Sequence, residues 1–149
     1  AGSKIVAFDI KKDKYELPDY DYVIDMYDKI AAMIDAGILK SVYAIGYGGI
    51  CEAVSKMAFG NKLGVKLAKT VDADDLTAKK YGSIILEVEK DNVTELGIPC
   101  TVIGEVQDAP EFVYGDAVIA MDEALDAKSF SIFCKSINSA SYPIWFSLH

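Results

Sequence analysis

Residues 43–61 read YAIGYGGICEAVSKMAFGN and combine three patterns in one continuous stretch. The β-prone run before the turn begins two positions earlier and spans residues 41–45. Three glycines follow within four positions, and apolar residues then recur at helical spacing from Ile50 onward. Glycines this close together favour a tight turn, because glycine adopts positive φ at little steric cost. The stretch therefore predicts a strand, a glycine turn and a helix that begins at about Gly49.

The segment before this unit predicts a strand and a helix. Residues 4–10 are rich in β-formers and lead into a charged loop, and Asp19 then follows Pro18 at a position suited to an N-cap. Gly37 is typical of the residue that ends a helix. The predicted apolar face of this helix consists of Val23, Met26, Tyr27, Ile30, Met33 and Ile34.

The segment after the unit predicts mainly strands. They are expected at residues 64–68, 83–89, 98–106, 112–114 and 117–120, the last two as a hairpin around Gly115 and Asp116. Acidic residues 72–75 indicate a solvated helix start rather than a metal cluster, and residues 121–130 predict a short helix. Residues 139–149 carry no pattern that places them. The mixture of strands and helices predicts an α/β (α+β) fold.

Length and composition define the broad class of protein. The chain has 149 residues, of which 52% are hydrophobic and 26% are charged, so we expect residues 1–149 to form one globular domain. The formal net charge is −8, which disfavours nucleic acid and anionic membrane surfaces as partners. The apolar runs are too short to cross a bilayer. We therefore expect a soluble, cytoplasmic protein.

Cysteine and histidine residues are few and scattered. The three cysteines, Cys51, Cys100 and Cys134, form no CxxC pair, and His149 is the one histidine. A disulfide framework, a zinc site and a Cys-His nucleophile are therefore not expected. Without a second histidine or a carboxylate cluster, the sequence assigns no catalytic residue and no metal ligand.

The glycine turn is the candidate binding site. The first N–H groups of a helix lack partners and carry a partial positive charge, so Gly46, Gly48, Gly49 and Ile50 are predicted to bind a phosphate. The motif lacks the Lys-Ser/Thr of a Walker A sequence and the third glycine of GxGxxG. The alternative is that the glycines serve only the tight turn and the packing of the helix on the sheet.

Four side chains flank the turn. Glu52 and Lys56 are spaced as an i, i+4 ion pair on the helix surface, and we interpret them as solvated charges. Tyr43 and Tyr47 are interpreted as packing residues, because an ordinary tyrosine is a poor base at neutral pH.

Read together, these segments resemble the C-terminal domains of the aminoimidazole ribonucleotide synthetase superfamily, and within it the phosphoribosylformylglycinamidine synthase family. The resemblance extends over about residues 4–120 and rests on residues 43–61, 63–65, 81–88 and 98–106, which follow the family order. In the family a similar glycine turn starts a helix that ends in Met-Ala-Phe, as residues 57–59 do here. The Met-Ala-Phe helix resembles the second copy of this domain more than the first.

The resemblance implies a mixed sheet of about four to six strands packed with helices, in one domain of a larger synthetase. It implies an ATP-dependent carbon–nitrogen ligase that uses glutamine-derived ammonia to convert formylglycinamide ribonucleotide (FGAR) to its amidine in purine biosynthesis. The implied partners are N-terminal synthetase domains, a glutaminase domain and the ribonucleotide. ATP and magnesium are expected in the full-length enzyme, with none bound to this fragment, which should be inactive alone.

Two departures from the family pattern leave an alternative open. Ala44 and Tyr47 stand where the family often has aspartates. They favour a structural or regulatory domain without a ligand, for which we expect Tyr47 to be buried across the turn. Another member of the superfamily, such as a hydrogenase-maturation protein, is a further alternative. In each case, a face prepared for absent neighbours should form an exposed apolar patch.

Overall fold

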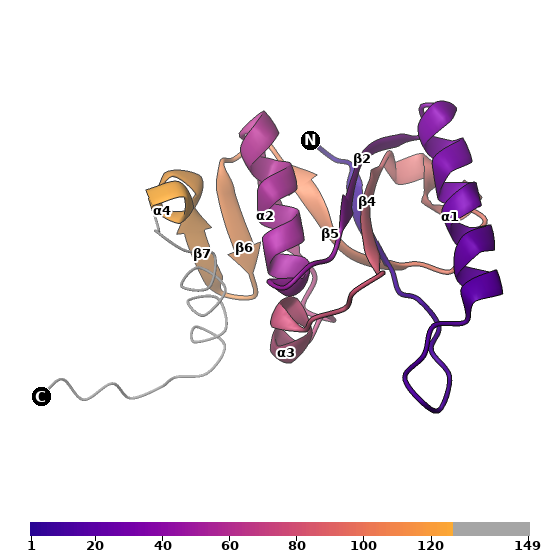
Figure 1. The fold of residues 1–149 in the computed structure, drawn as a ribbon. Helices are drawn as coiled ribbons and strands as arrows, with labels where there is room; N and C mark the ends of the chain where they lie inside the picture. Colours follow the sequence, from indigo (N-terminus) through magenta and orange to yellow (C-terminus); the bar gives the residue numbers. More distant parts are fainter. Residues whose placement is uncertain (127–149) are drawn as a thin grey trace, which may run out of the picture.

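The computed structural model describes residues 1–126, which form one sheet with helices against it (Figure 1). The strands are β1 (Lys4–Phe8), β2 (Leu39–Ala44), β3 (Gly64–Leu67), β4 (Ile84–Val88), β5 (Thr101–Gln107), β6 (Glu111–Tyr114) and β7 (Ala117–Ala120). The helices are α1 (Tyr20–Asp35), α2 (Gly49–Asn61), α3 (Ala73–Thr77), the 3₁₀ helix η1 (Lys90–Glu95) and α4 (Met121–Asp126). The predicted α/β (α+β) class is confirmed.

The sheet has seven strands in the order β2-β4-β1-β5-β3-β6-β7, so the prediction of four to six strands is too low. Neighbouring strands are antiparallel, except that β3 and β6 are parallel. The predicted hairpin around Gly115 and Asp116 is confirmed as β6 and β7, with Tyr114 opposite Ala117. The parallel pairing with β3 adds this hairpin to the main sheet, which explains the larger strand count.

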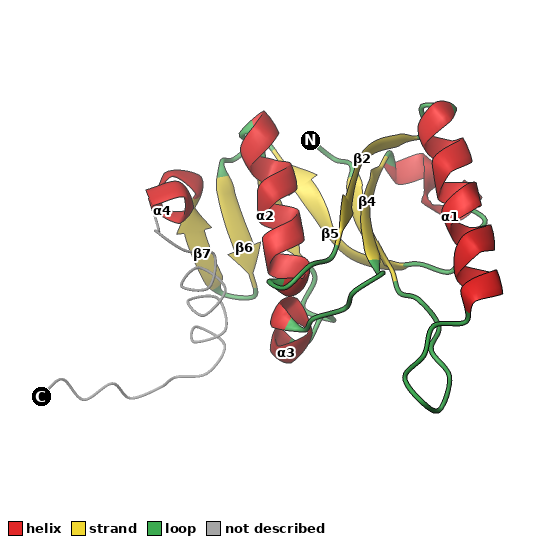
Figure 2. Cartoon of the chain, in the orientation of Figure 1, coloured by secondary structure: helices red, strands yellow, loops and turns green. Residues whose placement is uncertain are grey.

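The two long helices cover opposite faces of the sheet, and each face has its own core (Figure 2). Successive residues of a strand point to opposite faces. In β1, accordingly, Ile5 and Ala7 pack in the core under α2, whereas Val6 and Phe8 pack in the core under α1. The strands at the centre of the sheet are therefore buried on both sides.

Helix α1 begins and ends where the sequence predicts. The Asp19 carboxylate accepts a hydrogen bond from the Tyr22 backbone N–H at 3.2 Å, which caps the helix start. Gly37 follows the helix with φ of +71°, a conformation that glycine adopts readily. Met26, Ile30 and Met33 are buried against the sheet. Tyr27 and Ile34, which we predicted on the same buried face, are exposed instead.

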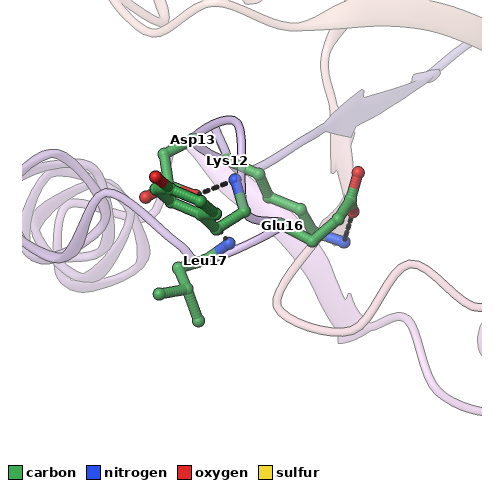
Figure 3. A network of polar contacts seen from close by, with 5 residues as sticks. Lys12, Asp13, Glu16 and Leu17 are labelled. Carbon is green, nitrogen blue, oxygen red and sulfur yellow. Dashed lines mark hydrogen bonds and ion pairs between the residues drawn. The ribbon is translucent and has the colours of Figure 1, made fainter.

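A projecting loop joins β1 to α1, as predicted from its charged residues (Figure 1). The Asp13 carboxylate orders it by accepting hydrogen bonds from the backbone N–H groups of Tyr15 at 2.8 Å and Leu17 at 3.0 Å (Figure 3). Lys12 and Glu16 form an ion pair at 3.3 Å across the same turn. The loop therefore enters α1 in a defined conformation.

Other element boundaries differ modestly from the predictions. The first strand ends at Phe8 rather than at residue 10, and η1 was not predicted. The acidic stretch 72–75 does start a helix, α3, as predicted. The predicted helix 121–130 is α4 as far as Asp126, and residues 127–130 and 139–149 lie outside the described residues.

Candidate functional site

The glycine turn lies between the end of β2 and the start of α2, with α3 beside the helix start (Figure 1). Ile45 holds the start of the glycine turn in place, because its N–H donates to the Ser83 carbonyl at 2.9 Å and its side chain is buried. Within the turn, the Gly49 N–H donates to the Gly46 carbonyl at 3.3 Å. The predicted strand, glycine turn and helix are confirmed.

Gly49 is required by its conformation and by a close approach. Its φ is +68°, and a Cβ at this position would lie 2.7 Å from the Leu76 carbonyl oxygen and 2.8 Å from the Thr77 carbonyl carbon. Both atoms belong to the backbone of α3, which cannot move away as a side chain can. This glycine therefore serves helix packing, as the alternative interpretation of the turn expected. Ile50, the next residue, is buried in the core under α2.

Gly48 makes room for a carboxylate from its own helix. The Gly48 N–H donates a hydrogen bond of 2.6 Å to Glu52 Oε2. A Cβ on Gly48 would lie 2.5 Å from the Glu52 Cβ and equally close to Oε2. Glu52 Oε1 accepts a hydrogen bond of 2.5 Å from Lys56 Nζ. The negative group at the start of α2 is thus the side chain of Glu52.

The surroundings of Glu52 favour its ionised form. The hydrogen bond from Lys56, followed by that from the Gly48 backbone, lowers the pKa of Glu52 below its ordinary value. Hydrogen bonds with Glu52 and Tyr43 raise the pKa of Lys56. The predicted ion pair of Glu52 with Lys56 is confirmed. The prediction missed the bond from Glu52 to Gly48, so Glu52 is more than a solvated charge.

The two tyrosines beside the turn differ in burial. Tyr43 is partly buried and packs against the core under α2, as predicted. Tyr47 is 71% exposed, so its prediction as a packing residue is wrong. The Tyr47 ring packs against Lys79, whose Nζ lies 4.0 Å from the ring centre. The Tyr47 side chain therefore does not cover the turn.

Residues 1–126 contain no group of three His, Cys, Asp or Glu side chains that could hold a metal ion. Cys51 is buried, and burial raises the pKa of the Cys100 thiol, which disfavours the nucleophilic thiolate. Cys134 and His149 lie outside the described residues. No helix in the described part of the chain is long and apolar enough to span a membrane.

Comparisons with known proteins place this geometry in context. No protein-family model matches the chain. The PurL subunit of phosphoribosylformylglycinamidine synthase from Deinococcus radiodurans is 29% identical in an alignment of 103 residues, which covers 62% of this chain and 14% of the relative. Phosphoribosylformylglycinamidine synthase II from Thermotoga maritima superposes with a TM-score of 0.65 at 14% identity, covering 81% of this chain and 25% of that protein. The hydrogenase-maturation protein HypE from E. coli superposes with a TM-score of 0.58 at 14% identity, covering 83% and 50%.

The fold belongs to the class of domains that the solved PurL and HypE structures share. Within that class, the similarity in sequence is to PurL, so the resemblance stated from the sequence is confirmed. The chain spans about a seventh of the curated relative and a quarter of the solved PurL.

Proposed function

We propose that residues 1–149 form one domain of a phosphoribosylformylglycinamidine synthase, a larger ATP- and glutamine-dependent ligase that converts FGAR to its amidine. In this proposal the turn formed by Gly46, Gly48, Gly49 and Ile50 contributes to binding the substrate phosphate. N-terminal synthetase domains and a glutaminase domain are its partners, and the cytoplasm is its compartment. The nucleotide, magnesium and ammonia chemistry belongs to those other segments, so the domain alone is inactive.

The carboxylate of Glu52 at the start of α2 is the observation that supports a phosphate site. An anion is already held there by the Gly48 N–H, at a helix end whose dipole favours negative charge. A phosphate oxygen that took the place of Glu52 Oε2 would accept the same hydrogen bond. Because Lys56 already pairs with Glu52, the displaced carboxylate would keep a partner.

Ligands of related proteins support the assignment to this enzyme. PurL from T. maritima forms complexes with FGAR and with ATP, and this chain superposes on those two structures with TM-scores of 0.64 and 0.59. HypE shares the fold at a similar identity, so the fold alone does not separate the two functions. The match in sequence to PurL favours the ligase.

Titration of the chain with inorganic phosphate and with FGAR, followed by backbone amide NMR, tests the proposal. We expect saturable shifts centred on Gly48, Gly49 and Ile50. Two unit charges about 4 Å apart near a protein surface interact by about 1–4 kcal/mol. Glu52→Gln removes one such charge and keeps the side-chain size, so it should tighten phosphate binding by about tenfold.

Glu105→Gln is the matched control, because Glu105 also pairs with a lysine, Lys4 at 2.7 Å, but on β1 and β5 rather than at the turn. It should leave the affinity unchanged. The titration is repeated with the N-terminal synthetase domains added in trans, where binding that appears only in the mixture also supports the proposal. Amide shifts that stay flat for the wild-type chain, Glu52→Gln and the mixture would contradict a phosphate site.

A structural domain without a ligand is the second candidate, and the Glu52 bond to Gly48 also favours it, because that N–H already has a partner. The other expected sign of such a domain, Tyr47 buried across the turn, is absent, since Tyr47 is exposed. The flat titration described above is the result that this candidate expects.

A further inference from the structure

Helix α1 carries a second apolar stripe that its own fold does not bury. It consists of residues 20, 24, 27, 31 and 34, which are Tyr20, Ile24, Tyr27, Ala31 and Ile34. All five are exposed, the four large ones by 66%, 58%, 37% and 47% in chain order. The stripe that packs on the sheet is a different one, formed by Met26, Ile30 and Met33. We call residues 20, 24, 27, 31 and 34 the seam.

The spacing of the seam is that of a coiled-coil heptad. Successive members are four, three, four and three residues apart, which places them at alternating d and a positions over two heptads. One member is fixed in place, because the Tyr27 hydroxyl donates a hydrogen bond of 2.5 Å to the Gly82 carbonyl. An apolar face with this repeat fits a second helix laid along α1.

Negative charge borders one side of the seam. Asp21, Asp28 and Asp35 each directly follow a seam residue and recur every seven residues, which are the e positions of the heptad. The one lysine of α1, Lys29, pairs with Asp25 at 2.9 Å. Within residues 1–126, the three e-position aspartates form no ion pair. A partner helix therefore meets an unneutralised acidic edge.

This charge pattern selects among possible occupants. In an antiparallel pair of two copies of this chain, the aspartates at the e positions would face one another and repel. In a parallel pair of two copies, each aspartate would face a g position of the other copy. The g positions of α1 are Val23 and Ile30, which are uncharged, and Ile30 is buried in its own core. A partner helix with an apolar face and with lysine or arginine along its edge would cover the seam and would pair with the aspartates beside it.

We propose that the seam of α1 is a docking surface for a helix of another domain or chain that has an apolar face and a basic edge. The proposal does not depend on the glycine turn, which belongs to α2. Its test uses the whole chain and two synthetic helical peptides of about three heptads. Both carry leucine at a and d, and the flanking e and g positions are lysine in one peptide and glutamate in the other.

Fluorescence anisotropy should show that the chain binds the lysine peptide about tenfold more tightly than the glutamate peptide. This difference in affinity should decrease as the salt concentration rises. Ile24→Lys should reduce the affinity at least tenfold. Asp28→Lys should narrow or reverse the preference between the peptides. Val118→Lys is the matched control, because Val118 is 55% exposed on β7, an edge strand, and should leave binding unchanged.

Circular dichroism checks that each variant is folded, and the exposure of Ile24 and Asp28 makes loss of the fold unexpected. Equal affinity for both peptides, or no binding of either at millimolar concentration, would overturn the proposal. Self-association of the chain in sedimentation, abolished by Ile24→Lys, would overturn it in favour of a second copy as the occupant.

Discussion

Glu52 connects the glycine turn to the first two turns of α2. One carboxylate oxygen accepts from the Gly48 backbone and the other from Lys56. The i, i+4 spacing predicted the second contact from the sequence. The first could not be predicted in the same way, because it depends on the path of the turn back toward the helix. The choice of glycine at position 48 follows from the same contact, since a Cβ there would collide with Glu52.

The lowered pKa of Glu52 predicts a pH dependence of stability. Because this pKa is lower in the folded chain than in the unfolded chain, ionised Glu52 stabilises the fold above about pH 4.3, the ordinary glutamate value. The stabilisation is lost as the pH falls through the folded-state pKa. Urea denaturation should therefore show a difference in unfolding free energy between the wild-type chain and Glu52→Gln that is largest near neutral pH and vanishes in acid.

Glu123→Gln controls for the loss of one negative charge, because Glu123 is exposed on α4. A specific role of Glu52 would be contradicted if Glu52→Gln and Glu123→Gln changed the unfolding free energy with the same pH dependence. A difference for Glu52→Gln that stays constant from neutral to acidic pH would contradict it as well.

Helices α2 and α3 meet at Gly49, and this contact supports a prediction about stability. Gly49→Ala adds a methyl group against the α3 backbone in a left-handed conformation, so it should destabilise the chain by about 2 kcal/mol or more. Gly60→Ala is the matched control in the same helix, because a Cβ at Gly60 meets nothing within 4 Å. It should stabilise by about 0.5 kcal/mol. Equal effects of the two variants in urea denaturation would contradict the close approach at Gly49.

Most elements could be predicted from local patterns, and the failures have physical causes. Asp19 and Gly37 predicted the limits of α1, because capping and a left-handed residue are local properties. The 3₁₀ helix η1 was missed because its six residues have no apolar period. Tyr27 and Ile34 were assigned to the core because the seam lies next to the buried stripe, and helical spacing alone merges the two.

The sheet as a whole could be predicted less well than its parts. Each strand leaves a local signal, but the pairing of β3 with β6 joins segments about 47 residues apart, as Val65 opposite Phe112 shows. The position of each candidate site residue relative to α3 also depends on contacts between segments that are separate in the sequence. Such contacts depend on tertiary packing, which no single segment contains. The joining of the β6–β7 hairpin to the main sheet and the contact at Gly49 therefore required the structure.

The burial of the sheet predicts unequal protection of its strands from hydrogen exchange. Strands β1 and β4 lie between the two cores, whereas β7 is an edge strand in which Val118 and Ala120 are exposed. Native-state exchange by NMR should give opening free energies for β1 and β4 that equal the global value, and lower values for β7. Equal protection in β4 and β7 would contradict this order.

The place of β1 inside the sheet, between β4 and β5, has a consequence for synthesis on the ribosome. Val6 pairs with Leu86 on one side and with Val102 on the other, about 80 and 96 residues later in the chain. At about 5–20 residues per second, the first strand is made about 4–20 s before its partners. During translation the apolar run IVAF, residues 5–8, has no partner strands to pair with. The nascent chain therefore exposes an aggregation-prone segment, which chaperones of the cell would shield.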